Sequence, residues 1–237
     1  MLDRINSEIK AKINPNQWTS TNDVLDWFIN LKDKDTLTFI VFDIVDFYPS
    51  ITIELLSTCL EWAGKFTIIR NDDKETILHA RRTLLYDNNN KAWEKREGRN
   101  QFDVSMGAYD GAEICELVGL YALSQIKKRL NTHSAGLYRD DGLAVLSRAS
   151  GSRADRARKD LIKIFSDLGL RITVQTNLKS VDFLDVTLNL ETETFQPYRK
   201  PNDTPLYVHR DSNHPPLRTK TNPLSRRKTH FSVILEQ

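Results

Sequence analysis

Two adjacent carboxylates, Asp140 and Asp141, lie at the tip of a β-hairpin predicted for Gly136–Leu146 (GLYRDDGLAVL). Apolar residues on both sides of an Asp-Gly step predict two short strands joined by a tight turn. Neighbouring carboxylates repel each other, and a hard divalent cation such as Mg²⁺ would offset that repulsion. The pair is therefore a candidate metal site, and the alternative is an exposed turn with two solvated acids.

A third carboxylate, Asp43, interrupts the apolar run Leu37–Val45. Such a run predicts a strand that is buried on both faces. A carboxylate inside a buried strand is costly unless it is paired or binds a metal ion. We therefore expect Asp43 either to pair with an Arg or Lys or to join the two acids of the hairpin. Asp46, close behind, is assigned to the turn or the surface and not to the metal site.

Two segments resemble motifs A and C of reverse transcriptases, the palm polymerases that copy RNA into DNA: FDIVDFYPSI at 42–51 and LYRDDGL at 137–143. The downstream runs VDFLDVTLNL at 181–190 and YRKPNDTPLYVHRDSNHPP at 198–216 resemble the Penelope-like retroelement branch or a close relative. The resemblance covers roughly Leu37–Pro216. A lone Tyr-X-Asp-Asp string is weakly specific, but the ordered set of motifs is strongly so.

The resemblance implies a two-metal site that transfers a nucleotide from a dNTP to a primer 3′-hydroxyl. In such a site, Asp43 and Asp140 bridge two Mg²⁺ ions about 3.5–4 Å apart, with Mn²⁺ as a substitute. Asp141 completes or supports the site, and the carbonyl of Ile44 adds an oxygen ligand. Tyr48 matches the family position that stacks under the sugar and excludes a 2′-hydroxyl, and core packing is the alternative role for this ring.

Two further nucleotide contacts follow from the resemblance. The turn at Met106-Gly107 takes the place of motif B, where a glycine lets the backbone approach the template base and the incoming sugar. Met106 replaces the more common Gln, and Asp110–Glu113 replaces a Ser-Pro step. The alternative for the Gly107 turn is a plain strand-to-helix connection that a glycine permits. Lys179 corresponds to a motif D lysine that protonates the leaving pyrophosphate, or is simply an exposed loop lysine.

The net charge of +2 is too small to argue for nucleic-acid binding, which must come from local clusters. From Tyr198 onward, basic residues alternate with aromatic ones in a Pro-rich segment, a composition that suits backbone contacts and base stacking. The histidines in this segment lack Cys partners, which argues against a zinc site. The residues expected to bind nucleic acid are Tyr138, Arg139, Arg199, Lys200, His209 and Arg210.

The scaffold predicted to position these residues is an α+β, reverse-transcriptase-like palm with an antiparallel sheet backed by helices on one face. Strands are expected at Leu37–Val45, Ala135–Tyr138, Leu143–Leu146, Arg171–Thr176, Phe183–Leu190 and Phe195–Arg199. Helices are expected at 1–13, 21–31, 52–62, 71–86, 111–130 and 152–168. In the 71–86 helix, His79, Arg81 and Arg82 are assigned to the solvated face. The hairpin that contains the FLDV element is expected at an edge of the sheet.

The predicted organisation has four parts: a helical lead-in at 1–35 that is a remnant of the junction between fingers and palm, the palm at 36–190, a basic Pro-rich segment at 191–218, and a disordered tail at 219–237. No basic fingers strand precedes motif A, and no helical thumb pattern follows the FLDV element. We therefore expect this chain alone to bind nucleic acid weakly and to polymerise poorly.

The 237 residues are 39% hydrophobic and 28% charged, a globular balance with room for one sizeable core. Cys59 and Cys115 lie in apolar helical contexts and predict a reduced intracellular protein, nuclear or cytoplasmic. No membrane-spanning run is present. The expected function is RNA-directed DNA polymerisation on an RNA or DNA template with a primer and dNTP. The alternatives are a non-catalytic nucleic-acid-binding retroelement remnant and a metal-dependent nuclease.

Overall fold

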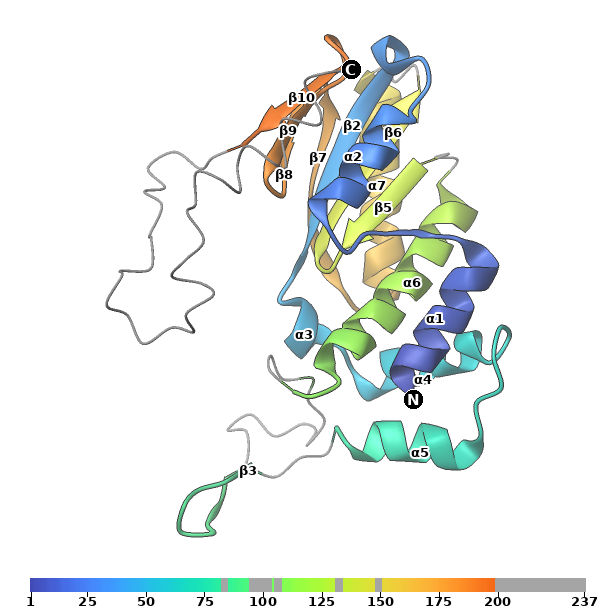
Figure 1. The fold of residues 1–237 in the computed structure, drawn as a ribbon, viewed down its shortest axis with the longest axis vertical. Helices are drawn as coiled ribbons and strands as arrows, with labels where there is room; N and C mark the ends of the chain where they lie inside the picture. Colours follow the sequence, from blue (N-terminus) through green and yellow to red (C-terminus); the bar gives the residue numbers. More distant parts are fainter. Residues whose placement is uncertain (82–84, 94–103, 105–107, 131–133, 148–150, 199–237) are drawn as a thin grey trace, which may run out of the picture. The chain divides into compact units, whose positions relative to one another are not determined.

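The computed structural model describes residues 1–81, 85–93, 104, 108–130, 134–147 and 151–198 (Figure 1). The helices are α1 Leu2–Ile13, α2 Thr21–Ile29, the 3₁₀ turn η1 Lys34–Thr36, α3 Phe47–Ser50, α4 Ile53–Ala63, α5 Asn71–His79, α6 Gly111–Arg129 and α7 Gly151–Asp167. The strands are β1 Asn16–Gln17, β2 Leu37–Val45, β3 Leu85–Tyr86, β4 Ala92–Trp93, β5 Ser134–Tyr138, β6 Asp141–Ser147, β7 Arg171–Leu178, β8 Ser180–Phe183, β9 Val186–Asn189 and β10 Thr194–Pro197. Met1–Tyr198 forms one compact unit.

The unit is built on a five-stranded sheet with the strand order β1-β5-β6-β2-β7. Each pair of neighbours among β5, β6, β2 and β7 is antiparallel, as predicted. The two-residue strand β1 pairs parallel with β5 at the edge of the sheet, which was not predicted. A three-stranded sheet, β10-β9-β8, and the small ribbon β3-β4 complete the described strands. The α+β architecture with an antiparallel central sheet is thus confirmed.

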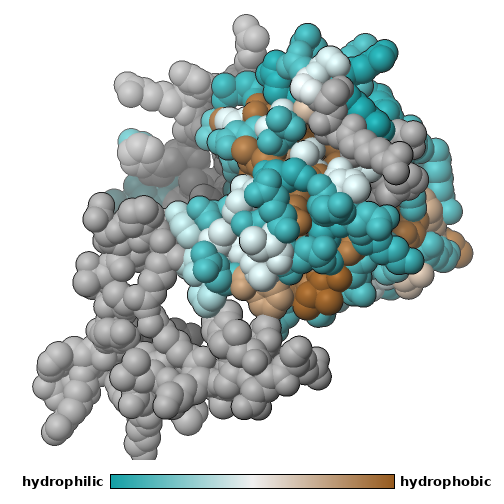
Figure 2. All heavy atoms as spheres, turned by 90° about the horizontal axis from the view of Figure 1, so that it is seen from above, coloured by the Kyte–Doolittle hydropathy of each residue, from teal (hydrophilic) through white to brown (hydrophobic). Residues whose placement is uncertain are grey.

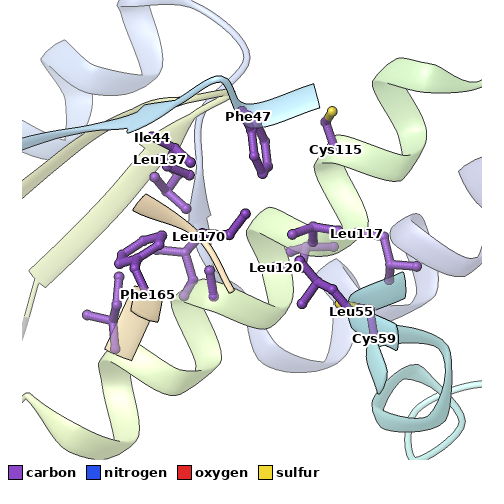
Figure 3. Close-up of a cluster of buried hydrophobic side chains, with 14 of the residues drawn as sticks. Ile44, Phe47, Leu55, Cys59, Cys115, Leu117, Leu120, Leu137, Phe165 and Leu170 are labelled. Carbon is purple, nitrogen blue, oxygen red and sulfur yellow. The ribbon is translucent and has the colours of Figure 1, made fainter. Parts of the chain in front are cut away.

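Helices α1, α4, α6 and α7 form the main core on one face of the central sheet. Alternate residues of β2, namely Ile40, Phe42 and Ile44, belong to the buried cluster that also contains the apolar faces of α4, α6 and α7. Phe42 contacts Phe165 of α7 with a ring-centroid distance of 5.5 Å. Figure 3 shows part of this cluster, with Ile44 and Leu137 on the sheet and Leu117 and Leu120 on α6. The alternation of β2 therefore directs residues 39, 41 and 43 to the other face of the sheet.

The other face is partly covered by α2 and the three-stranded sheet. Phe39 stacks on Phe28 of α2, with centroids 6.3 Å apart, and Phe28 also contacts Phe195 of β10. Trp18, which follows β1, contacts Phe183 of β8 at 5.7 Å. Among these contacts, the Phe28–Phe39 pair is the one that includes β2, near the start of the strand. Asp43, near the opposite end of the strand, remains partly exposed.

Side chains cap two of the helices at their N-termini. Thr52 caps α4, because its side chain accepts a hydrogen bond from the Leu55 amide at 3.2 Å. Ser20 caps α2, in a reciprocal capping box with Asp23.

Two predictions were wrong. The single strand expected at Phe183–Leu190 is two strands, β8 and β9, since Leu184 adopts a left-handed φ of 53° and the FLDV element turns the chain. Helix α5 ends at His79, and Arg81 is buried at 5% exposure in an ion pair with Asp110, so it does not belong to a solvated face.

The described surface is mainly hydrophilic. In the view of Figure 2, hydrophilic residues cover most of the described surface, and hydrophobic residues form smaller patches between them. Every helix within the described ranges is too short or too polar to cross a membrane.

Candidate active site

The hairpin between β5 and β6 turns two residues earlier than the Asp-Gly signal predicts. Tyr138 pairs with Asp141, so Arg139 and Asp140 form a two-residue loop, and Asp141-Gly142 is already part of strand β6. Residue 142 must be a glycine in this strand, because a Cβ there would lie 2.1 Å from the ring of Phe42. Gly142 is therefore required inside the strand, where it makes room for a core aromatic ring.

This register places Asp43 directly opposite Asp141 on the neighbouring strand β2. Cross-strand partners project to the same face of a sheet, with their Cβ atoms about 4.5–5.5 Å apart. The tip is fastened to β2 because the amide of Ile44 donates to the carbonyl of Asp140 at 3.0 Å. Asp43, Ile44, Asp140 and Asp141 thus meet at one end of the central sheet, although they come from segments about 100 residues apart.

The electrostatics at this end are unfavourable to negative charge. Burial raises the pKa of Asp43, and the nearby charge of Asp140 raises it further. Among the described residues, no Arg, Lys or His pairs with the carboxylate of Asp43 or Asp140, so the alternative of a paired buried acid for Asp43 is not what this region shows. Asp46, in contrast, is exposed and pairs with Arg171 at 3.3 Å, in keeping with its assignment to the surface.

The residues present suit a divalent cation. Their donors are hard carboxylate oxygens, and a cation would relieve the repulsion between Asp43 and Asp140. Within the described ranges, no three His, Cys, Asp or Glu side chains form a metal-binding group by themselves. Mg²⁺ is commonly held by one or two carboxylates together with substrate phosphates and water. The residues therefore fit a divalent cation whose coordination is completed by oxygens from outside these side chains.

Tyr48 lies in α3, next to the carboxylates, and is half-buried. Its ring packs against the main core, with the ring of Phe47 at 6.3 Å. Burial raises the pKa of Tyr48, the neighbouring Cys115 raises it further, and Arg139 lowers it. The charges of Arg139 and Asp140 both shift the pKa of the Tyr48 hydroxyl, so this hydroxyl lies near the hairpin tip. Core packing and a position at the site therefore coexist, and the sugar-selecting role remains a prediction.

Cys115 on α6 lies close to Tyr48, and this proximity was not predicted from the sequence. Its thiol is buried, burial raises its pKa to about 12, and the neighbouring Tyr48 lowers it. Figure 3 shows Cys115 on α6 near Phe47. The helical spacing from Gly111 to Val118 indicates that residue 115 is buried, but nothing in the local pattern points to Tyr48.

Lys179 lies away from the carboxylates. Its ammonium donates to the carbonyls of Asp35 at 2.6 Å and Leu37 at 2.9 Å. Leu37 begins β2, and Asp43 is six residues further along, or roughly 20 Å at about 3.3 Å per residue. The structure therefore does not bring Lys179 close to the carboxylates of Asp43, Asp140 and Asp141. Its role here is to satisfy backbone carbonyls before and at the start of β2.

The remaining predicted contacts divide into two groups. Tyr138 and Arg139 lie at the hairpin tip, and the guanidinium of Arg139 is 5.6 Å from the centre of the Tyr138 ring. The other predicted residues lie outside the described part of the chain: Met106, Gly107, Arg199, Lys200, His209 and Arg210.

Comparison with known proteins identifies the fold. No family model and no curated protein matches the chain. Among solved structures, apo telomerase from Candida tropicalis, truncated from its C-terminal domain, aligns with a TM-score of 0.60 at 14% identity and covers 83% of this chain and 44% of its own. Telomerase from the same organism in complex with a fragment of telomeric RNA aligns at 0.59, with 15% identity and coverages of 86% and 39%.

A third neighbour is the RNA-dependent RNA polymerase of a human picobirnavirus, with a TM-score of 0.55, 11% identity and coverages of 80% and 37%. The chain thus spans less than half of the length of each of these proteins. At these identities the similarity shows the fold alone, which is that of a polymerase palm.

Proposed function

We propose that this chain is the palm of an RNA-directed DNA polymerase of the reverse transcriptase class, related to Penelope-like retroelements. The observation that carries the proposal is the strand register that sets Asp43 opposite Asp141, with Asp140 beside them and no cationic partner for Asp43 or Asp140 among the described residues. The polymerase palm fold supports the same reading. The substrates we propose are a dNTP and a primer on an RNA or DNA template.

The chain's contribution to catalysis is to position charges, because phosphoryl transfer needs little covalent help from the protein. Asp43, Asp140 and Asp141 supply the oxygens that would hold two Mg²⁺ ions, with the carbonyl of Ile44 as a further donor. When bound, such ions favour ionisation of the primer 3′-hydroxyl and neutralise charge on the leaving pyrophosphate. The bond from Ile44 to Asp140 fastens the tip to β2, which keeps the carboxylates in place.

Single-nucleotide extension of a primer tests this proposal. The chain is mixed with a primer annealed to an RNA template, one complementary dNTP, and Mg²⁺ or Mn²⁺. Since this chain alone is expected to polymerise poorly, we expect weak single-nucleotide extension by the wild type. That extension should be lost in Asp140→Asn and kept in Asp46→Asn, a matched change of an exposed carboxylate. Equal extension by wild type and Asp140→Asn would refute the catalytic assignment.

A second candidate is a non-catalytic nucleic-acid-binding remnant. It is favoured by the lack of a group of three metal ligands among the described residues. It predicts salt-dependent binding of primer–template, no extension under any metal condition, and no effect of Asp140→Asn on binding.

Tyr48→Ala should admit ribonucleotides. A side chain that excludes one extra group by contact contributes roughly 1–3 kcal/mol to discrimination. The preference for dNTP over rNTP should therefore fall at least about tenfold, while dNTP incorporation remains detectable. Competition between dNTP and rNTP in the extension assay measures the ratio. Tyr48→Phe keeps the ring and should keep the preference. Unchanged selectivity in Tyr48→Ala would leave this ring a packing role only.

A further inference from the structure

Arg139 occupies a backbone conformation that its side chain disfavours. It is the first loop residue of the two-residue hairpin, and its φ is 55°, in the left-handed region. Glycine or asparagine normally fills such a position, because a Cβ crowds the following carbonyl there. An unfavourable residue at a functional hairpin tip is a reason to look for a role of its side chain.

The exposed guanidinium of Arg139 lies over the ring of its neighbour Tyr138. It lies 5.6 Å from the centre of the Tyr138 ring, a distance typical of cation–π contacts. Six other arginines in the described region pair with acids, among them Arg129 with Asp167 and Arg171 with Asp46. No Asp or Glu among the described residues pairs with Arg139, although Asp140 is its neighbour in sequence.

We propose that Arg139 is a phosphate ligand, which the stacked Tyr138 ring orients at the edge of the carboxylate site. The inference rests on the proposed function and adds the residue that receives the anionic part of the substrate. The planar fork of a guanidinium suits bidentate bonds to phosphate, and it supplies positive charge where the three carboxylates supply none. The phosphate belongs either to the triphosphate of the incoming nucleotide or to the backbone of the bound strand.

This role predicts opposite effects on stability and on binding. Arg139→Gly removes the guanidinium and also relieves the left-handed backbone, so the melting temperature should rise by about 2–4 °C, the shift typical of a 1 kcal/mol gain in a chain of this size. Arg139→Ala removes the guanidinium but keeps a Cβ, so it should melt near the wild-type temperature. Both variants should lose phosphate affinity to the same extent, about tenfold, as expected for a charge-assisted hydrogen bond.

The experiment measures melting temperature, dNTP affinity with Mg²⁺, and affinity for a labelled single-stranded oligonucleotide over a range of salt concentrations. The variants are Arg139→Gly, Arg139→Ala and, as a matched change of an exposed arginine on α7, Arg156→Ala. If the strand supplies the phosphate, the slope of log affinity against log salt falls by about 0.7–0.9 and dNTP affinity is unchanged. If the nucleotide supplies it, dNTP affinity falls and the oligonucleotide slope stays the same.

Two outcomes would overturn the inference. Wild-type affinity for both ligands in Arg139→Gly and Arg139→Ala would show that the guanidinium binds no phosphate. A lower melting temperature in Arg139→Gly would show that the side chain serves the fold. A wild-type chain that binds neither dNTP nor oligonucleotide would refute the proposed function itself, a result distinct from the other two.

Discussion

Asp43→Asn should abolish nucleotide transfer and at the same time stabilise the metal-free chain at neutral pH. The loss of transfer is expected to be on the order of 10³–10⁵-fold, the range that a single charge-stabilising group contributes to phosphoryl transfer. The gain in the free energy of unfolding should reach up to about 1 kcal/mol, the size of cross-strand charge effects, since burial and the nearby charge of Asp140 both disfavour the ionised form of Asp43. A substitution that only damages the fold would lower stability and activity together.

The stability gain should depend on pH in a defined direction. Because the pKa of Asp43 is raised in the folded chain, the folded state holds a proton that the unfolded state has already lost in the interval between the ordinary and the raised pKa. Relative to Asp43→Asn, the metal-free wild type should therefore lose stability as the pH rises through that interval. Asp43→Asn should lack this loss and should match the wild type below the interval.

Urea unfolding of both chains at several pH values, in the presence of a chelator, measures the difference. Asp46→Asn is the control, since Asp46 is exposed and paired with Arg171. A wild-type stability that rises through the interval relative to that of Asp43→Asn would contradict the raised pKa of Asp43, which rests on burial and on the charge of Asp140.

Gly142→Ala should destabilise the fold by about 3 kcal/mol, the upper part of the usual range for overpacking a core. The new methyl group would overlap the Phe42 ring, which is 1% exposed and packed on Phe165. The same change at exposed Gly151, where nothing lies within 4 Å of the added Cβ, should have little effect. Chemical denaturation measures the free energy of unfolding of both variants.

A smaller ring partner should restore part of the loss. Phe42→Leu combined with Gly142→Ala should be less destabilised than the sum of the two single changes, because the shorter side chain leaves room for the methyl group. If Gly142→Ala is as stable as wild type, then Gly142 lies in the turn and the carboxylate register described above is wrong.

The fold and the carboxylate site could be anticipated because their signals are local. The apolar run of β2 and the hairpin around Arg139 are visible as strand patterns, and Asp43 breaks the first of them. The turn position could not be read in the same way. The Asp-Gly step is a good turn signal, but Phe42, about 100 residues earlier, requires a glycine inside the strand and thereby moves the turn to Arg139-Asp140.

Other features depend on contacts that no local pattern encodes. The FLDV element alternates like a strand, yet Leu184 takes a left-handed conformation there and turns the chain. Arg81 lies in a polar stretch but is buried by its ion pair with Asp110, 29 residues away. Lys179 was assigned to motif D by sequence resemblance to reverse transcriptases. The antiparallel pairing of β7 with β2 places it at the opposite end of the sheet from Asp43.

The central claim is that Asp43, Asp140 and Asp141 hold divalent cations together with a nucleotide, and Mn²⁺ titration followed by electron paramagnetic resonance tests it most directly. The wild-type chain should bind Mn²⁺ tightly only in the presence of dNTP, because the carboxylates need the substrate phosphates to complete the coordination. Asp43→Asn and Asp140→Asn should lose this dNTP-dependent binding, and Asp46→Asn should retain it. Equal dNTP-dependent Mn²⁺ binding by all four chains, or by none of them, would contradict the account.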